Sequence, residues 1–112
     1  MQQTSGLYIG LMSGTSVDAV DAALVHIDTK LELLASLSFE IPIDLKNQIH
    51  HICTAESAAI DELGRLNRRI GNLFADATLA LLSTARLSAQ DIRGIGSHGQ
   101  TIRHRPPSES EP

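Results

Sequence analysis

The segment SGTSVDAVD, residues 13–21, concentrates hydroxyl and carboxylate groups in a short turn between two apolar runs. Consecutive backbone N–H groups in such a turn point into one concavity that can bind phosphate oxygens, and Gly14 lets a ligand approach where another residue would place a Cβ. The hydroxyls of Ser13, Thr15 and Ser16 can donate to the same oxygens. Asp18 would repel a phosphate, so its expected role is to hold Mg²⁺ through bound water.

An ordinary hairpin turn is the competing interpretation of this segment. Serine, threonine and aspartate side chains often do no more than satisfy the N–H groups of a turn, and Asp21, at the start of the next strand, could cap the turn or orient it. Phosphate loops of the Walker and dinucleotide-binding types are excluded, because both need a helix directly after the glycines. Physical chemistry alone leaves the hairpin and the anion site equally favoured.

A second group of polar residues lies in GIGSHGQTIRHRP, residues 94–106. The run 92–97 predicts a short buried strand that ends at these residues, and ligands in open α/β sheets gather outside the carboxyl ends of strands. The side chains offer a mixture of donors and acceptors that suits sugar hydroxyls. We therefore expect a binding site here in preference to a purely structural histidine. Its expected members are His98, Gln100, Thr101 and His104.

The elements that must position these two segments follow from hydrophobic periodicity. The expected strands are 7–13, 20–28, 31–41 and 92–97, the expected helices are 44–54 and 57–85, and 88–91 is an expected capped turn. The first strands form an antiparallel meander, and the last returns in parallel after a helical crossover. The fold class is therefore α/β, a mixed sheet with packed helices. The strand 20–28 is apolar on both faces, which is typical of a central strand covered on both sides.

Single residues in the helical region carry further expectations. Asp44 is a candidate N-cap. Gly64 and Gly71 lie inside the longer helix, where each costs about 1 kcal/mol relative to alanine, so we expect them to permit close packing against another backbone. The basic cluster at 65–69 is expected to be a solvated face more than an anion site, and Cys53 a small core residue more than a nucleophile.

Length and composition exclude several classes of protein. The chain has 112 residues, 42% of them hydrophobic, which suits one small domain. A formal net charge of −4, 3% aromatic residues and no tryptophan argue against nucleic-acid binding. No apolar stretch approaches the roughly 20 residues that cross a bilayer, and the N-terminus lacks the pattern of a signal peptide. The single cysteine fits a reducing compartment, so we expect a cytoplasmic protein.

The end of the sequence predicts an incomplete domain. Residues 107–112 form a polar tail rich in proline, which will extend neither a strand nor a helix. A catalytic domain rarely stops on a loop directly after a strand that carries polar groups. We therefore expect residues 1–106 to be part of a larger lobe, with a truncation point at the tail.

Taken together, GLMSGTSVDAVDAAL and IGSHGQTIRHRP resemble the N-terminal part of the anhydro-N-acetylmuramic acid kinases, over about residues 7–106. The family usually has glycine where this sequence has Ala19, and alanine tolerates a positive φ poorly, so a slightly altered phosphate loop is expected. The resemblance implies the actin-like, sugar-kinase (ribonuclease H-like) ATPase fold, in which nucleotide lies between two α/β lobes. It also implies that the full-length protein is a homodimer.

The reaction implied by the resemblance uses ATP and Mg²⁺. Water opens the ring of 1,6-anhydro-N-acetylmuramic acid and the 6-oxygen receives the γ-phosphoryl group, in cell-wall recycling and amino-sugar breakdown. The residues that the resemblance assigns to ATP are Gly14, Thr15, Ser16, Val17, Asp18, Ala19, Val20 and Asp21, with Asp18 near Mg²⁺. The segment 98–101 would lie at the sugar side of the cleft.

The resemblance also implies that no catalytic residue lies in this chain. The aspartate that activates water is expected beyond residue 112. Phosphoryl transfer depends on positioning both substrates and stabilising charge, so the chain alone is expected to be inactive. Two alternatives remain at this point: a stand-alone, non-catalytic nucleotide-binding module, and a scaffold without a ligand.

Overall fold

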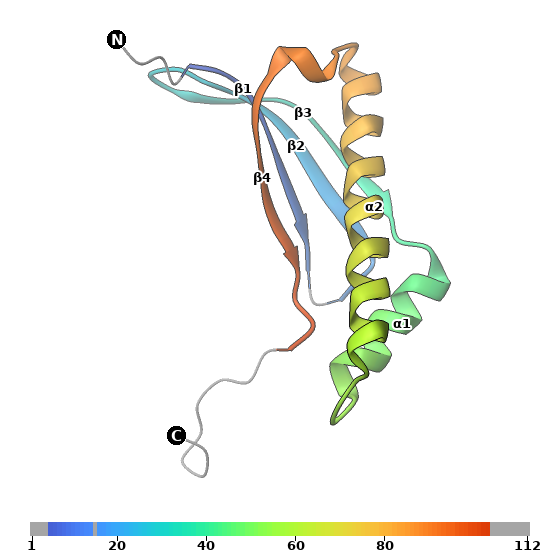
Figure 1. Ribbon diagram of the computed structural model, residues 1–112. Coiled ribbons are helices and arrows are strands. Elements are labelled where there is room, and N and C mark those ends of the chain that lie inside the picture. The colour runs from blue at the N-terminus through green and yellow to red at the C-terminus, as the bar shows by residue number, and fades with distance from the viewer. Residues whose placement is uncertain (1–4, 15, 104–112) are drawn as a thin grey trace, which may run out of the picture.

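The computed structural model describes residues 5–14 and 16–103 (Figure 1). The elements in chain order are β1 (Gly6–Ser13), β2 (Ala19–Ile27), β3 (Leu31–Glu40), α1 (Ile43–Thr54), α2 (Ile60–Ala85), a 3₁₀ turn (Ala89–Asp91) and β4 (Ile92–Gln100). This is the order that the periodicity predicts, and the α/β class is confirmed.

One mixed sheet contains all four of these strands, in the order β3-β2-β1-β4. β2 is antiparallel to both β1 and β3, whereas β4 is parallel to β1, as predicted for a strand that returns after a helical crossover. Ser13, the last residue of β1, pairs with Val20 on one side and with Gln100 on the other. The two polar segments of the sequence therefore meet at one end of the sheet, which we call the polar end.

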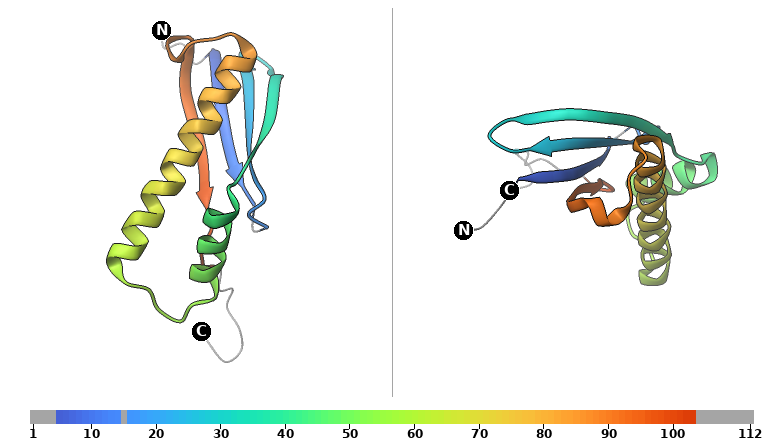
Figure 2. Two further views of the ribbon diagram at one scale, coloured as in Figure 1. Left: turned by 90° about the vertical axis from the view of Figure 1, so that its right-hand side faces the viewer. Right: turned by 90° about the horizontal axis from the view of Figure 1, so that it is seen from above.

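Helix α2 runs along one face of this sheet (Figure 2), and the hydrophobic core lies between them. Alternate residues are buried on this face in the second half of β1 and the first half of β2, as the two-residue period of a strand requires. The helices contribute Leu45, Ile49 and Ile52 from α1 and chiefly Leu66, Leu73, Phe74, Ala77 and Leu81 from α2. Full burial of a large apolar side chain stabilises the fold by about 1.5–3 kcal/mol.

The opposite face of the sheet, which we call the open face, has no helix over it within residues 5–14 and 16–103. Met12 exposes 51% of its surface there, and Asp21 is also exposed. The prediction that β2 is covered on both sides is therefore wrong for the described residues. Both helices belong to the single connection between β3 and β4, and both contribute to the same core, so they cover the same face.

The start of α1 differs from the prediction. Pro42, not Asp44, is the N-cap residue, and no side chain caps the helix. Asp44 lies in the first turn, where its carboxylate accepts a hydrogen bond from Arg69 at 2.7 Å. Arg69 also donates to the Gln48 side chain at 2.7 Å. Arg69, one member of the basic cluster, thus links α2 to α1.

The longer helix begins three residues later than predicted, and its glycines have a different surrounding. Gly64 and Gly71 are exposed, and a Cβ at either position would meet no atom of the described residues within 4 Å. The prediction that they permit close backbone packing is therefore wrong.

The predicted capped turn is confirmed, because the Ser88 N–H donates to the Asp91 carboxylate at 2.8 Å. Neither described helix has both the length and the apolarity needed to cross a membrane.

Candidate functional site

The polar end of the sheet is fastened by a hydrogen bond between the two sequence segments. The buried hydroxyl of Ser13 donates to Oε1 of Gln100 at 2.5 Å. The side-chain nitrogen Nε2 of Gln100 in turn donates to the backbone carbonyl oxygens of Gly14, at 3.5 Å, and Thr101, at 3.0 Å. Residues 87 positions apart in the chain therefore form one structural unit. The parallel pairing of β4 with β1 brings the two segments together.

A tight turn connects β1 to β2. The N–H of Val17 donates to the carbonyl of Gly14 at 3.2 Å, and Val17 adopts a left-handed φ of 56°. This conformation is costly for a β-branched residue, but the side chain of Val17 is only 1% exposed, so its burial offsets the cost. Ala19, by contrast, begins β2 and is not among the described residues with positive φ. Ala19 therefore does not need the positive φ on which the expectation of an altered loop rested; the residue with a left-handed backbone is Val17.

The predicted ATP-binding segment divides into buried and accessible residues. Val17 and Val20 point into the core, so only their backbone could contact a ligand. Gly14 and Ser16 are exposed, and a Cβ added to Gly14 would meet no atom within 4 Å, which leaves room for a ligand. Thr15 lies outside the described residues. The accessible groups suit the oxygens of a phosphate.

Asp18 is held by two contacts to the region where β3 leads into α1. Its carboxylate lies 2.5 Å from Nζ of Lys46, and its carbonyl accepts a hydrogen bond from the N–H of Ile41 at 3.2 Å. The hydrogen bond from Lys46 is the main reason that the pKa of Asp18 lies below its ordinary value. The side chain of Asp18 remains 65% exposed. Lys46 was missed from the sequence, because it lies 28 residues from Asp18 and no local pattern marks it.

Asp21 and Asp18 face different surroundings. Asp21 accepts a hydrogen bond from the Ser38 hydroxyl at 2.6 Å. It lines a shallow hollow of about 800 Å³ on the open face, together with Met12 and His98. Asp18 instead lines a separate hollow of about 500 Å³ beside α1. The two aspartates therefore do not form a joint metal site.

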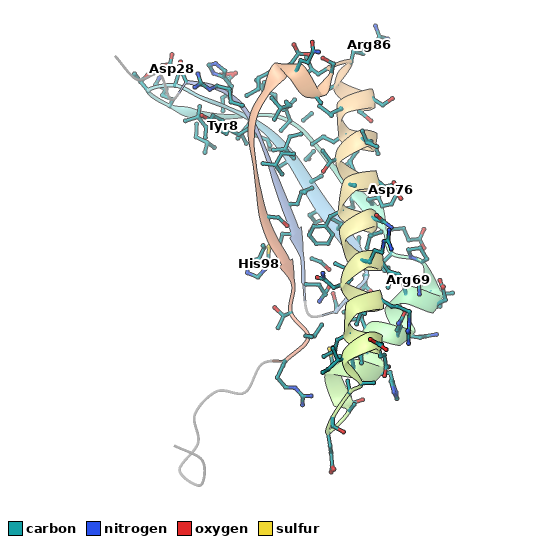
Figure 3. The ribbon with its side chains drawn as sticks, viewed as in Figure 1. Tyr8, Asp28, Arg69, Asp76, Arg86 and His98 are labelled. Carbon is teal, nitrogen blue, oxygen red and sulfur yellow. The ribbon has the colours of Figure 1, made fainter. Side chains whose placement is uncertain are left out.

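Backbone geometry separates the predicted sugar-binding residues. β4 extends to Gln100, three residues beyond the predicted end at Ser97, because Gln100 pairs with Ser13. Gly99 has φ of +74°, which interrupts the alternation of side chains along the strand. His98 consequently lines the open-face hollow (Figure 3), whereas Gln100 lines a groove of about 340 Å³ against α2.

Of the last two members of the predicted sugar site, Thr101 is among the described residues and His104 is not. Thr101 is half-buried, and its carbonyl accepts a hydrogen bond from Gln100 at 3.0 Å. The carbonyl oxygen of Thr101 also lies 4.0 Å from Sγ of Cys53, a residue that packs against the core as expected. His104 lies outside the described residues. The structure therefore brings Gln100 and Thr101 together but not His98 with them.

The described residues could bind Mg²⁺ only if the ion keeps most of its water ligands. Among the described residues no group of three or more histidine, cysteine, aspartate and glutamate side chains lies close enough together to hold a metal. Mg²⁺ commonly keeps several waters and uses one or two protein carboxylates. The exposed carboxylate of Asp18 meets that requirement, with the ammonium of Lys46 as its present partner.

Comparison with known proteins gives one consistent result. A model of the anhydro-N-acetylmuramic acid kinase family matches residues 6–111. Two curated relatives named anhydro-N-acetylmuramic acid kinase, from Vibrio vulnificus strains YJ016 and CMCP6, are 46% and 45% identical over 107 residues. These alignments cover 95% of this chain but 29% of each relative, so the chain spans less than a third of their length. The mixed sheet is consistent with the first lobe of a sugar-kinase, actin-like ATPase fold. Because the family model matches nearly the whole chain, this chain belongs to the anhydro-N-acetylmuramic acid kinase family.

Proposed function

We propose that this chain forms one wall of the active site of an ATP-dependent kinase that acts on 1,6-anhydro-N-acetylmuramic acid. The observation that carries the proposal is the hydrogen bond between Ser13 and Gln100, which fixes the two polar segments at one end of the sheet. Family membership supports the reaction class. As part of the same proposal, the full-length protein is a cytoplasmic homodimer.

In this proposal the turn between β1 and β2 receives the phosphates of ATP. Backbone N–H groups and the hydroxyl of Ser16 donate to phosphate oxygens, and Gly14 leaves space for their approach. Asp18 would hold Mg²⁺ through bound water, and the ion would supply charge neutralisation. His98, on the open face, is directed toward the sugar.

The proposed overall reaction consumes one water, one ATP and one anhydro sugar. Water adds at the anomeric carbon, the bond from that carbon to the 6-oxygen breaks, and the freed 6-oxygen accepts the γ-phosphoryl group. The products are ADP and N-acetylmuramic acid 6-phosphate. The base that takes the proton from water is not assigned to any residue of this chain, so we propose that the 112-residue chain binds nucleotide without turning it over.

Calorimetric titration of the chain with ATP in the presence of Mg²⁺ tests the binding part of this proposal. We expect saturable binding that Asp18→Asn weakens. Asp28→Asn is the matched control, because Asp28 is an exposed aspartate in the turn between β2 and β3. If both variants and the unchanged chain bind ATP with equal affinity, Asp18 is not part of the nucleotide site.

A coupled assay of ADP release with the anhydro sugar tests the catalytic part. We expect no turnover above a control without protein. Turnover well above that control would show that the chain contains its own catalytic base, and would refute the assignment of catalysis to a region outside it.

A further inference from the structure

The ion pair between Lys46 and Asp18 is difficult to explain by stability. The side chains of Lys46 and Asp18 are 30% and 65% exposed, and ion pairs accessible to solvent contribute little to stability. The backbone hydrogen bond from Ile41 to Asp18 already joins the turn to the start of α1. The ammonium group is therefore not needed to hold these two segments together.

The surroundings of this ion pair are open and carry a mixed charge. The hollow of about 500 Å³ at this place is lined by Asp18, Glu40, Lys46 and the segment 41–43. Lys46 is the one cationic residue among the described residues that line it. A phosphate that approaches the turn between β1 and β2 therefore meets the repulsion of Asp18, and Lys46 is the neighbouring group that can offset that repulsion.

From this arrangement, and resting on the proposed function of the turn, we propose that Lys46 is a nucleotide-binding residue that serves two anions in turn. It holds the carboxylate of Asp18, and it passes to a phosphate oxygen when a Mg²⁺-bound nucleotide brings a cation to that carboxylate. The exchange keeps each anion paired with a cation throughout binding. A flexible lysine side chain with three donors suits such a transfer better than a rigid guanidinium fork.

Two affinities with opposite expected changes test this inference. In Lys46→Met the affinity for Mg²⁺–ATP, measured by calorimetry, is expected to fall about tenfold, because a charged hydrogen bond to phosphate is lost. The affinity for Mn²⁺ alone, measured by electron paramagnetic resonance, is expected to rise about threefold, because the carboxylate of Asp18 no longer has a competing cation. Damage to the fold would lower both affinities together.

The chain provides a matched control in the second exposed ion pair, Arg69 with Asp44. Its partners lie 2.7 Å apart with side chains 41% and 69% exposed, so Arg69→Met removes a comparable contact elsewhere on α1. We expect it to leave both affinities unchanged. Lys46→Gln, which keeps a donor without the charge, is expected to behave like Lys46→Met, and Lys46→Arg is expected to recover most of the nucleotide affinity.

The outcomes separate this inference from the proposed function. If Asp18→Asn weakens Mg²⁺–ATP binding and Lys46→Met does not, the phosphate site stands and the role of Lys46 is refuted. If the unchanged chain does not bind Mg²⁺–ATP, the proposed function fails and the role of Lys46 with it. A parallel fall in both affinities for Lys46→Met, with a lowered melting temperature, would show a structural role only.

Discussion

On the face of the sheet toward α2, alternate residues of β1 and β2 are buried, from Ile9 at 1% exposure to Val20 at 0%. On the open face the residues between them are exposed or half-buried, and Asp21 pairs there with Ser38. The same strands thus bury side chains in the core on one side and present accessible groups such as Asp21 on the other. Substitutions of buried residues on the covered face, Ser13 included, should therefore change stability, whereas substitutions of accessible groups at the polar end and on the open face should change binding.

The largest difference in stability is expected between substitutions of one apolar residue on each face. Ile9→Ala removes a side chain that is 1% exposed, and is expected to lower the free energy of unfolding by about 2–5 kcal/mol through lost burial and a cavity. Met12→Ala removes one that is 51% exposed, and is expected to cost less than about 1 kcal/mol. Urea denaturation measures both values. Equal losses would mean that the open face is covered in solution.

A smaller difference in stability is expected when one serine hydroxyl is removed from each face. Ser13→Ala leaves the side-chain oxygen of Gln100 without its buried donor, at an expected cost of about 1–3 kcal/mol. Ser38→Ala removes the exposed hydrogen bond to Asp21, and is expected to change stability by less than about 0.5 kcal/mol. Thermal unfolding of both variants is the measurement. A larger loss for Ser38→Ala would contradict the assignment of the buried side.

A gain in stability is expected at the exposed surface of α2. Gly64 lies in the helix interior with open space at its Cβ position, so Gly64→Ala should raise the free energy of unfolding by about 0.5–1 kcal/mol. Denaturation with urea measures the gain. If the variant is instead destabilised, a close contact exists at this position, as the sequence-based expectation had it.

The smallest effect concerns the exposed ion pair that is not at the polar end. The hydrogen bond from Arg69 lowers the pKa of Asp44. A carboxylate whose pKa is lowered in the folded state stabilises that state above the unfolded pKa, and this contribution disappears as the pH falls through the folded pKa. Arg69→Met should therefore raise the pKa of Asp44 toward its ordinary value, as measured by carboxyl ¹³C NMR during acid titration. An unchanged pKa would show that the pair does not persist in solution.

Much of the fold could be predicted because the signals are local. The two-residue period gave the strands, the helical period gave α2, and Ser88 with Asp91 marked a capped turn. The errors came from information that is not local. Nothing near Gly64 shows whether another backbone lies against it, and the apolar composition of β2 does not show which face a helix covers.

The candidate site was predicted to the same limited extent. Residue type identified the turn and the end of β4 as polar segments, but their meeting at one end of the sheet is shown by the pairing of β4 with β1 in the structure. The ion pair of Asp18 with Lys46 depends on where α1 begins, and the separation of His98 from Gln100 depends on the backbone of Gly99. Neither is visible in a pattern of neighbouring residues, because each is set by the three-dimensional path of the chain.

The most direct test of the central claim is a residue-resolved NMR titration of the chain with Mg²⁺–ADP. We expect amide shift changes that saturate together at Gly14, Ser16, Asp18 and Gln100, with no comparable change around Arg86 at the far end of α2. Figure 3 shows how far Arg86 lies from His98 and the polar end. Shifts spread evenly over the chain, or absent from 14–21, would contradict a phosphate site at this turn.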